Sequence, residues 1–402
     1  MRLLVLNAGS SSLKFDLFEP GGGAPPPGQR TVTGAVERIG GRSVMTTRLG
    51  PAGREEAPVE AGDHAQATVL VLDWLKAARA LAGGPDAVAH RVVHAGERFS
   101  APAQLDDAVL SAIAEVAPLA PLHNEPAIAA IRASRRTLGG QTPMVAVFDT
   151  TFHRSLPPRA AIYALPRAVA ERHGIRRYGF HGLAHRSLVE RWAFSGEPAT
   201  RARLVTLQLG NGASAAAVAH GRSVDTTMGF TPLEGLAMGT NSGDLDPAIP
   251  GYLARQEHLS LDQVDALLNG SSGLLGVSGT SADMADLLRA EEAGDERAAL
   301  AIDLFCYRAR KTVGAFMAAL GGADALVFGG GIGERSPAVR ARICEGMAWC
   351  GLVLDHARNT NALGCDARIS GNGSKPSAWV VAVDEASVIA TDALACLERT
   401  SH

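Results

Sequence analysis

Two stretches far apart in the chain share one layout. Residues 3–18 contain an apolar run, then Asn-Ala-Gly-Ser-Ser-Ser, then alternating Leu and Phe. Residues 204–218 again contain an apolar run, then a turn rich in Gly, Asn and Ser, then small apolar residues. Each pattern predicts a strand, a tight turn and a second strand. Because each opens one half of the chain, we expect a duplicated architecture in which two domains hold a polyphosphate between their turns.

The first turn carries groups that suit a phosphate. Gly9 allows a ligand to approach the backbone closely, and the hydroxyls of Ser10, Ser11 and Ser12 are hydrogen-bond donors. Lys14 can reach a phosphate as a point charge. An ordinary hairpin with a Ser/Gly turn explains this stretch alone equally well, and the second hairpin is what favours a phosphate site.

Length and composition indicate an ordinary globular protein of two domains. The chain has 402 residues, of which 46% are hydrophobic and 20% are charged. A net charge of -3 and a pI near 6.5 give no electrostatic reason to expect nucleic acid or membrane as a partner. No apolar run approaches the length of a membrane span, so we expect a cytoplasmic protein. The domains are expected at 1–150 with 386–402, and at 151–385.

The cysteine and histidine patterns argue against disulfides and zinc. The five cysteines are an odd number without a C-x-x-C pair, which favours idle or buried thiols. His181 and His185 are four residues apart but lack the glutamate of an H-E-x-x-H motif, so a zinc site there is disfavoured.

Several predicted strands end in polar residues, where α/β folds place ligand contacts. Arg91 lies at the end of an apolar run from residue 87, and Asp149 ends the run from residue 144. The segment 379–385 reads as a strand that ends in Asp384 and Glu385. Those two acids could equally start the last helix through its dipole or hold a metal. Further helices are expected over residues 64–81, 125–138, 296–320 and 386–398.

Two glycine-rich segments are candidates for ligand contacts. Residues 325–334 predict a strand that runs into a glycine turn, where adenine or phosphate could lie against bare backbone. The next helix is expected to have Ser336 as its cap, Pro337 at its first position and Gly351 past its end. No G-x-G-x-x-G or G-x-x-x-x-G-K-[ST] motif is present, which disfavours Rossmann and P-loop sites. Residues 231–247 form a long irregular segment of the kind that is usually functional.

Together these motifs resemble the acetate kinase family of short-chain carboxylate kinases, within the actin, sugar kinase and Hsp70 superfamily. The matching blocks run from one end of the chain to the other: Asn-x-Gly-Ser-Ser-Ser-x-Lys at 7–14, His-Arg-Val-Val-His at 90–94, Pro-Leu-Ala-Pro-Leu-His-Asn at 118–124, Val-Phe-Asp-Thr at 147–150, Arg-Arg-Tyr-Gly-Phe-His-Gly at 176–182, Leu-Gly-Asn-Gly-Ala-Ser at 209–214, Gly-Phe-Thr-Pro-Leu-Glu-Gly-Leu at 229–236 and Gly-Gly-Ile-Gly-Glu at 330–334. The resemblance implies an α/β, duplicated two-domain actin-like ATPase (ribonuclease H-like) fold with nucleotide in the interdomain cleft, and a homodimer.

The resemblance also implies a reaction. The γ-phosphoryl group of ATP would pass directly and reversibly to acetate or propionate, giving ADP and an acyl phosphate, with Mg²⁺ or Mn²⁺. Such a transfer needs much charge neutralisation and little covalent chemistry from the protein.

By match to the family motifs, each candidate residue has an implied role. The metal environment would include Asn7 and Glu385; Arg91 would bind the carboxylate or the phosphoryl group, Asp149 would be the active-site acid, and His181 would stabilise the transition state. The acyl pocket would be lined by Val93, Leu122, Phe180 and Pro232, together with Arg91. The nucleotide would lie near Lys14, Ser10, Ser12, Thr206, Leu207, Gln208, Leu209, Gly210, Asn211, Asp283, Gly331, Ile332, Gly333 and Glu334.

Three positions depart from the family pattern. Asn241 stands at the catalytic position where the family has an arginine, and Gln208 replaces a histidine. After Asp283, where the family has an arginine against the nucleotide, this chain has Met284 and Ala285. An asparagine can donate an amide hydrogen bond but brings no charge. Beside an active kinase, two alternatives therefore stay open: a catalytically weak nucleotide-binding relative that acts as a sensor or partner protein, and a kinase for a different small carboxylate.

Overall fold

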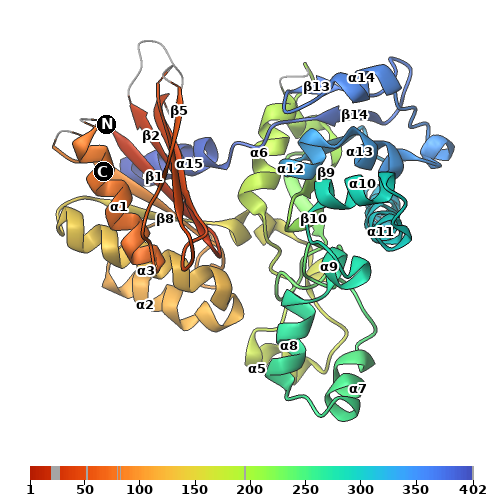
Figure 1. Cartoon of the computed structure of the whole chain (residues 1–402), viewed down its shortest axis with the longest axis horizontal. Helices are drawn as coiled ribbons and strands as arrows, with labels where there is room; N and C mark the ends of the chain where they lie inside the picture. The colour runs from red at the N-terminus through yellow and green to blue at the C-terminus, as the bar shows by residue number, and fades with distance from the viewer. Residues whose placement is uncertain (20–27, 51–52, 79, 82, 194–195, 401–402) are drawn as a thin grey trace. The chain divides into compact units, whose positions relative to one another are not determined.

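A computed structural model of the chain describes residues 1–19, 28–50, 53–78, 80–81, 83–193 and 196–400. The chain separates into two compact units (Figure 1). Unit 1 contains Met1–Thr151 and Asp384–His402, and unit 2 contains Phe152–Val383. The last helix thus belongs to the same unit as the first strand.

Unit 1 is built on a mixed sheet with the strand order β5-β4-β3-β2-β1-β6-β8-β7. Its strands are β1 (Leu3–Ala8), β2 (Ser12–Glu19), β3 (Gln29–Glu37), β4 (Val44–Leu49), β5 (Arg54–Pro58), β6 (Ala87–Val92), β7 (Ala103–Gln104) and β8 (Met144–Phe148). β1 pairs antiparallel with β2 and parallel with β6, which in turn pairs parallel with β8. The predicted first hairpin is confirmed.

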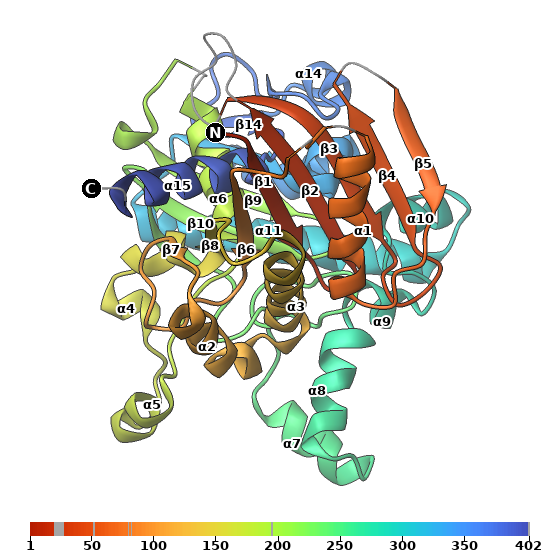
Figure 2. The same cartoon turned by 90° about the vertical axis from the view of Figure 1, so that its left-hand side faces the viewer.

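Helices cover both faces of the sheet at its parallel strands β1, β6 and β8, which explains why these strands are almost continuously apolar. The helices of unit 1 are α1 (His64–Ala77), α2 (Asp107–Glu115), α3 (Pro121–Leu138) and α15 (Glu385–Thr400), with the short 3₁₀ turn η1 (Ala117–Leu119). Leu4 and Leu6 pack in one apolar cluster with α1 and α3, which lie over the near face of the sheet in Figure 2. Leu3 and Val5 point to the other face and are also fully buried. α15 packs against β1, β6 and β8.

Unit 2 repeats the central part of this sheet. Its strand order is β11-β10-β9-β12-β14-β13, from β9 (Arg203–Leu209), β10 (Ala213–Ala219), β11 (Arg222–Thr226), β12 (Ala325–Gly329), β13 (Ala367–Arg368) and β14 (Ser377–Val380). β9 pairs antiparallel with β10 and parallel with β12, as β1 does with β2 and β6. The second predicted hairpin and the expected α/β duplication are confirmed.

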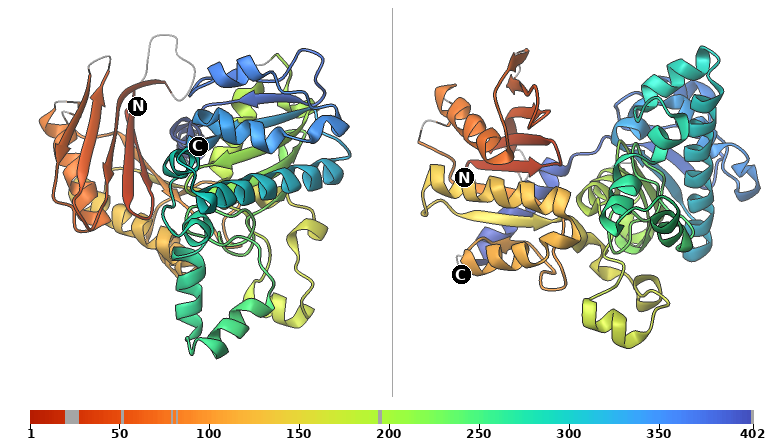
Figure 3. Two further views of the ribbon diagram at one scale, coloured as in Figure 1. Left: turned by 45° about the vertical axis from the view of Figure 1, so that its right-hand side comes forward. Right: turned by 60° about the horizontal axis from the view of Figure 1, so that its bottom comes forward.

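Unit 2 contains most of the chain's helices. They are α4 (Pro158–Ala161), α5 (Arg167–His173), α6 (Gly182–Trp192), α7 (Ala248–Gln256), α8 (Leu261–Gly270), α9 (Gly273–Ser278), α10 (Met284–Glu292), α11 (Glu296–Leu320), α12 (Gly330–Arg335), α13 (Pro337–Cys344) and α14 (His356–Asn361). In Figure 3 the long α11, predicted at these bounds, runs along the sheet of unit 2 and packs against β9 and β10. The segment between β11 and α7 has no regular structure, as expected.

One helix begins earlier than its sequence predicts. α3 starts at Pro121 and continues through Pro126, whereas the sequence favours a rigid loop up to residue 124. Proline is well tolerated at the first helical position. The buried Asn124 exchanges hydrogen bonds with the backbone of His94, its Oδ1 accepting from the amide at 2.9 Å, and this tertiary contact holds the early turn.

Three further predictions were wrong in detail. The glycine turn at residues 330–334 is the short helix α12. The helix capped by Ser336 ends at Cys344, because Glu345 leaves the helical conformation, and Gly351 instead ends the separate turn η5 (Met347–Cys350). The strand expected over residues 379–385 ends at Val380.

Two other expectations concern thiols and membranes. All five cysteines are free, in agreement with the sequence. Among the described residues, no helix is both long and apolar enough to span a bilayer.

The buried His90 predicts acid sensitivity in unit 1. Burial, aided by the charge of Arg135, lowers the pKa of His90 to about 3. An unfolded histidine titrates near 6.5, so the unfolded chain binds more protons below that pH. The free energy of unfolding therefore falls as pH drops from about 6.5 towards 3, by about 1.4 kcal/mol per pH unit for this group. In His90→Leu the stability difference between pH 7 and pH 5 should shrink by about 2 kcal/mol, measured by guanidinium unfolding.

The exposed His356 supplies the control, and His356→Gln should keep the wild-type pH dependence. An unchanged pH dependence in His90→Leu would show that His90 is not buried in its neutral form.

Candidate active site

Four polar side chains of unit 1 meet at one edge of its sheet. Asn7 lies in β1, Arg91 in β6, Asp149 directly after β8, and Glu385 at the start of α15. The register pairs Leu6 with His90, and Arg91 with residue 147, so the carboxyl ends of the three parallel strands coincide. This is where open α/β sheets place their ligand contacts.

Arg91 is the centre of this group. Its Nη2 forms an ion pair with Asp149 Oδ2, and its Nη1 donates to Asn7 Oδ1 at 3.2 Å. Asn7 Nδ2 donates in turn to Glu385 Oε2 at 2.8 Å. Burial by itself would lower the pKa of Arg91, but the carboxylates of Asp149 and Glu385 outweigh burial and raise it. Arg91 is therefore a fixed cation, held at the strand ends by an acid that is fully buried.

The first hairpin adds a second cation at this edge. Lys14 pairs directly with Asn7 across β1 and β2, and such partners project to the same face of a sheet. Its side chain is exposed, as is Ser10, while Ser12 is half-buried. The amide of Gly9 closes the turn by donating to the carbonyl of Ser12 at 2.8 Å. Unit 1 thus brings together the predicted phosphate, metal and carboxylate residues of its own half.

The oxygen atoms in this group suit a magnesium ion. Asn7 contributes an amide oxygen and Glu385 a carboxylate, the hard donors that Mg²⁺ prefers. Within the described ranges, no set of three or more His, Cys, Asp or Glu side chains is arranged around a metal position. The two donors Asn7 and Glu385 are compatible with Mg²⁺, which is commonly held by one or two carboxylates and by substrate phosphates.

In unit 2, His181 is the first member of a hydrogen-bonded chain. Its Nδ1 lies 2.8 Å from Ser214 Oγ, which is 2.9 Å from His185 Nε2, and His185 Nδ1 is 2.8 Å from Thr206 Oγ1. Burial is the main cause that lowers the pKa of His185 well below its usual value, so His185 is neutral. The single proton of Ser214 serves one histidine while its oxygen accepts from the other. The protonation of His181 Nδ1 is thereby coupled to the orientation of Ser214.

A third histidine, His153, holds the backbone next to His181. His153 Nε2 donates to the carbonyl of Phe180 at 3.0 Å, and its Nδ1 accepts from Ser223 Oγ at 2.8 Å. Burial lowers the pKa of His153 to about 4, in keeping with a neutral ring. His181 itself adopts a left-handed conformation, with φ of 54°. The Phe180 side chain is buried.

Sequence analysis missed Ser214, His153 and the role of His185. Ser214 lies in a motif block that was recognised, but a serine in a small-residue strand gives no separate signal. His153 follows Asp149 in the 3₁₀ segment η2 (Asp149–Ser155), outside any motif.

A second charged cluster supports the irregular segment after β11. Arg177 Nη1 donates to the carbonyls of Thr226 and Thr227 at 3.1 and 3.0 Å, and its Nη2 pairs with Glu234. The hydroxyl of Tyr163 donates to the same carboxylate and accepts from the amide of Phe230 at 2.8 Å. This cluster fixes the segment that carries the half-buried Pro232. Of the other predicted pocket residues, Val93 is buried after β6, and the side chain of Leu122 lies outside the described part of the structure.

Asn241 and Asp283 are both engaged in local structure. Asn241 Nδ2 donates to Asn269 Oδ1 on α8 at 3.4 Å, and its Oδ1 accepts from Thr240 Oγ1 at 3.2 Å. Asp283 caps α10 and accepts from the amides of Ala285 and Asp286 at 2.8 and 3.0 Å. Asn241 is thus bonded towards α8, and the Asp283 carboxylate is a helix cap.

The remaining predicted nucleotide residues lie on β9, its turn and α12. Leu207 and Leu209 are fully buried, so only their backbone is available to a ligand. The turn is closed by the amide of Gly210, which donates to the carbonyl of Gly212 at 3.0 Å, and Asn211 is exposed there. On α12, Gly331 is exposed, Ile332 is half-buried and Gly333 is buried; Glu334 Oε1 accepts from the amides of Gly330 and Val383 at 3.1 and 3.0 Å.

Gln208 faces the same glycines. A side chain at Gly330 would come within 2.9 Å of Gln208 Nε2, so the amide reaches the start of α12. Gln208 Oε1 is buried and has no hydrogen-bond partner in the described part of the chain.

Comparison with known proteins agrees with this geometry. The chain matches the sequence model of the Acetokinase family over residues 2–391. It is 47% identical to an acetate kinase of Solibacter usitatus, with the match covering 100% of both chains. The crystal structure of acetate kinase from Porphyromonas gingivalis superposes with a TM-score of 0.89 at 38% identity, covering 98% of this chain and 99% of that one. A propionate kinase from Francisella tularensis gives a TM-score of 0.89 at 36% identity, covering 97% and 98%.

These similarities extend over the whole of both units and over the strand ends that hold Arg91 and Asp149. The duplicated sheets are those of the actin-like ATPase fold. The chain therefore belongs to the acetate kinase family, the phosphotransferases that use a carboxyl group as acceptor.

Proposed function

We propose that the chain transfers the γ-phosphoryl group of ATP to acetate or propionate, giving ADP and an acyl phosphate, with Mg²⁺ as the metal. The observation that carries this proposal is the buried Arg91 and Asp149 pair with Asn7 and Glu385 beside it. It combines one fork-shaped cation, which suits a carboxylate or phosphoryl group, with oxygen donors that suit a magnesium ion.

In this reaction an oxygen of the acid forms a bond to the γ-phosphorus as the bond to the ADP oxygen breaks. Arg91 binds and orients the acid or the moving phosphoryl group, and Asp149 holds the guanidinium in place. Asn7 and Glu385 would hold a Mg²⁺ ion, which would supply charge neutralisation when bound. His181, oriented through Ser214, donates a hydrogen bond to the developing charge.

The remaining assignments follow from the same family pattern. Val93, Leu122, Phe180 and Pro232 would line a pocket for the short acyl group. The nucleotide would lie against Lys14, Ser10, Ser12, residues 206–211, Asp283 and residues 331–334, and the chain would act in the cytoplasm. Exposed apolar side chains of unit 2, such as Tyr252 and Leu261, support a homodimer.

Trapping of the acyl phosphate with hydroxylamine tests the proposal directly. Purified protein is incubated with ATP, Mg²⁺ and linear acids of one to six carbons, and hydroxamate is measured. We expect product with the two- and three-carbon acids. Nucleotide binding without any hydroxamate would instead identify a sensor or partner protein, and a preference for longer acids would identify a different carboxylate kinase.

Asp149→Asn should lower kcat by about a hundredfold or more, because Arg91 loses the charge that orients it inside a buried site. Arg91→Lys should have an effect of similar size, because an ammonium group lacks the two-pronged geometry. Steady-state hydroxamate formation measures both. The exposed Arg98 gives a matched control, and Arg98→Lys should keep wild-type rates. If Asp149→Asn folds correctly and retains wild-type activity, the pair of Arg91 and Asp149 does not take part in the reaction.

Asn241→Arg should raise kcat by about tenfold with little change in the KM for the acid, because a cation is added where the transition state spreads charge over three oxygens. No Lys or Arg occurs between residues 231 and 247, so the segment itself supplies no substitute. Asn241→Gln, which adds length without charge, is the control. Unchanged or lower turnover in Asn241→Arg would mean that position 241 does not face the transferred phosphoryl group.

Ser214→Ala should lower kcat by about tenfold and leave the KM for ATP nearly unchanged, because His181 Nδ1 loses its partner. Ser214→Thr retains the hydroxyl and should recover much of the rate. Ser223→Ala removes the equivalent hydroxyl from His153 and serves as the matched control. Equal losses in Ser214→Ala and Ser223→Ala would indicate a general packing effect.

A further inference from the structure

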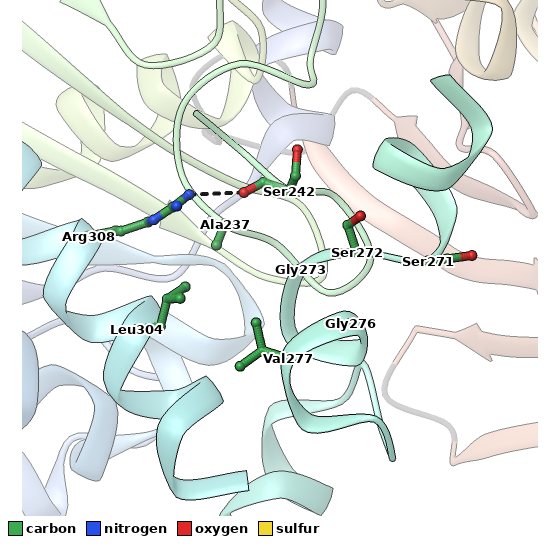
Figure 4. A pocket seen from close by; sticks show the side chains of 9 residues that line it. All are labelled: Ala237, Ser242, Ser271, Ser272, Gly273, Gly276, Val277, Leu304 and Arg308. Carbon is green, nitrogen blue, oxygen red and sulfur yellow. Dashed lines mark hydrogen bonds between the residues drawn. The ribbon is translucent and has the colours of Figure 1, made fainter. Parts of the chain in front are cut away.

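A cavity of about 320 Å³ lies in unit 2, and none of the residues that line it is assigned to the reaction (Figure 4). Three segments line it: the irregular segment near residue 241, the junction of α8 and α9, and α11. Its lining residues are Ala237, Ser242, Ser271, Ser272, Gly273, Gly276, Val277, Leu304 and Arg308.

Arg308 is the charged member of this lining. In Figure 4 its guanidinium reaches towards the segment of Ser242, where Nη1 donates to the carbonyl at 3.0 Å. Among the described residues, no Asp or Glu lies within ion-pair distance of Arg308, and its Nε and Nη2 form no hydrogen bond. A guanidinium has five N–H donors, and the edge formed by Nε and Nη2 can bind a carboxylate through two parallel bonds. Within the described residues, the charge of Arg308 is therefore not paired with a carboxylate.

The other walls of the cavity favour a small organic anion over a bare ion. Ala237, Val277 and Leu304 present apolar surface. The hydroxyls of Ser242 and Ser272 donate to the backbone carbonyls of Gly243 and Leu267 at 3.0 and 2.9 Å. Their protons are thus already in use, which leaves the guanidinium as the main recognition group. A monocarboxylate with a short alkyl chain matches both the charge and the apolar walls.

Backbone hydrogen bonds connect one wall of the cavity to the segment that contains Asn241. The amides of Ser272, Leu274 and Leu275 donate to the carbonyls of residues 240, 238 and 239 at 2.9, 2.8 and 2.9 Å. A side chain at Gly273 would lie 2.2 Å from the carbonyl of residue 238, so the two segments are in direct contact. A carboxylate bound to Nε and Nη2 would share the Arg308 guanidinium with the Ser242 carbonyl, which Nη1 binds, and Ser242 adjoins Asn241.

We propose that this cavity binds a small monocarboxylate on Arg308, and that its occupation changes turnover through the segment at residues 238–242. The binding site stands on the geometry alone, whereas its effect on turnover rests on the proposed kinase activity. The ligand class includes acids too long for the proposed acyl pocket, so substrate binding and effector binding can be separated.

The test uses 5,5,5-trifluoropentanoate as a probe and ¹⁹F NMR of the full chain. We expect one equivalent to bind wild-type protein, and Arg308→Gln to weaken binding at least tenfold. Lys311→Gln removes an exposed charge from the same helix and should bind as wild type. Val277→Phe fills the cavity while retaining Arg308 and should also abolish binding. Equal affinity in wild type and Arg308→Gln would overturn the site.

Turnover is then measured with acetate at increasing pentanoate concentrations. We expect kcat to change at least twofold in wild type and to stay constant in Arg308→Gln, without competition against acetate. Purely competitive inhibition that persists in Arg308→Gln would place pentanoate in the acyl pocket and overturn the effector role. If no acid gives hydroxamate, the proposed kinase activity fails, while the ¹⁹F binding result still decides the site.

Discussion

The buried ion pair between Arg91 and Asp149 is the interaction on which the rest of unit 1 depends. A fully buried carboxylate is costly unless a cation is close, and a buried arginine is costly without an anion. Loss of either partner would leave an uncompensated charge at the strand ends. Asn7 and Glu385 are placed by the same guanidinium, since Asn7 joins Arg91 to the start of α15. One pair thus orders three parallel strands and a helix from the far end of the chain.

Unit 2 has the same order of central strands as unit 1, but its strands carry different polar side chains. The described hairpin β9–β10 contributes Thr206 and Ser214 to a chain of hydroxyl and imidazole groups that leads through His185 to His181. Burial keeps His153 and His185 uncharged, so they can orient a neighbour without adding charge of their own. The duplication therefore provides two similar frames, one with an ion pair at its strand ends and one with a chain of hydroxyl and imidazole groups.

The spacing of apolar residues and glycines predicted those elements that depend mainly on residues close together in the sequence. Both hairpins and α11 follow from apolar periodicity and glycine stops, and they appear at the expected residues. The sequence could not predict where α3 begins, because a buried contact between Asn124 and His94 decides it. Family motifs predicted which side chains of unit 1 come together, and the strand register explains why they do. The Ser214 link to His181 and the bonds of Asn241 to α8 depend on three-dimensional neighbours, so no spacing in the sequence reveals them.

The position of α15 has a consequence for how the protein is made. This helix covers the face of the sheet to which Leu3 and Val5 point, and it supplies Glu385, yet it is synthesised after all of unit 2. During translation the first strands emerge early, but their second face stays open until all of unit 2 has passed through the ribosome. Unit 2, which is continuous in sequence, can complete its core first. An exposed apolar sheet face is prone to aggregate, so a nascent chain of this protein is a natural client for chaperones until α15 has left the ribosome.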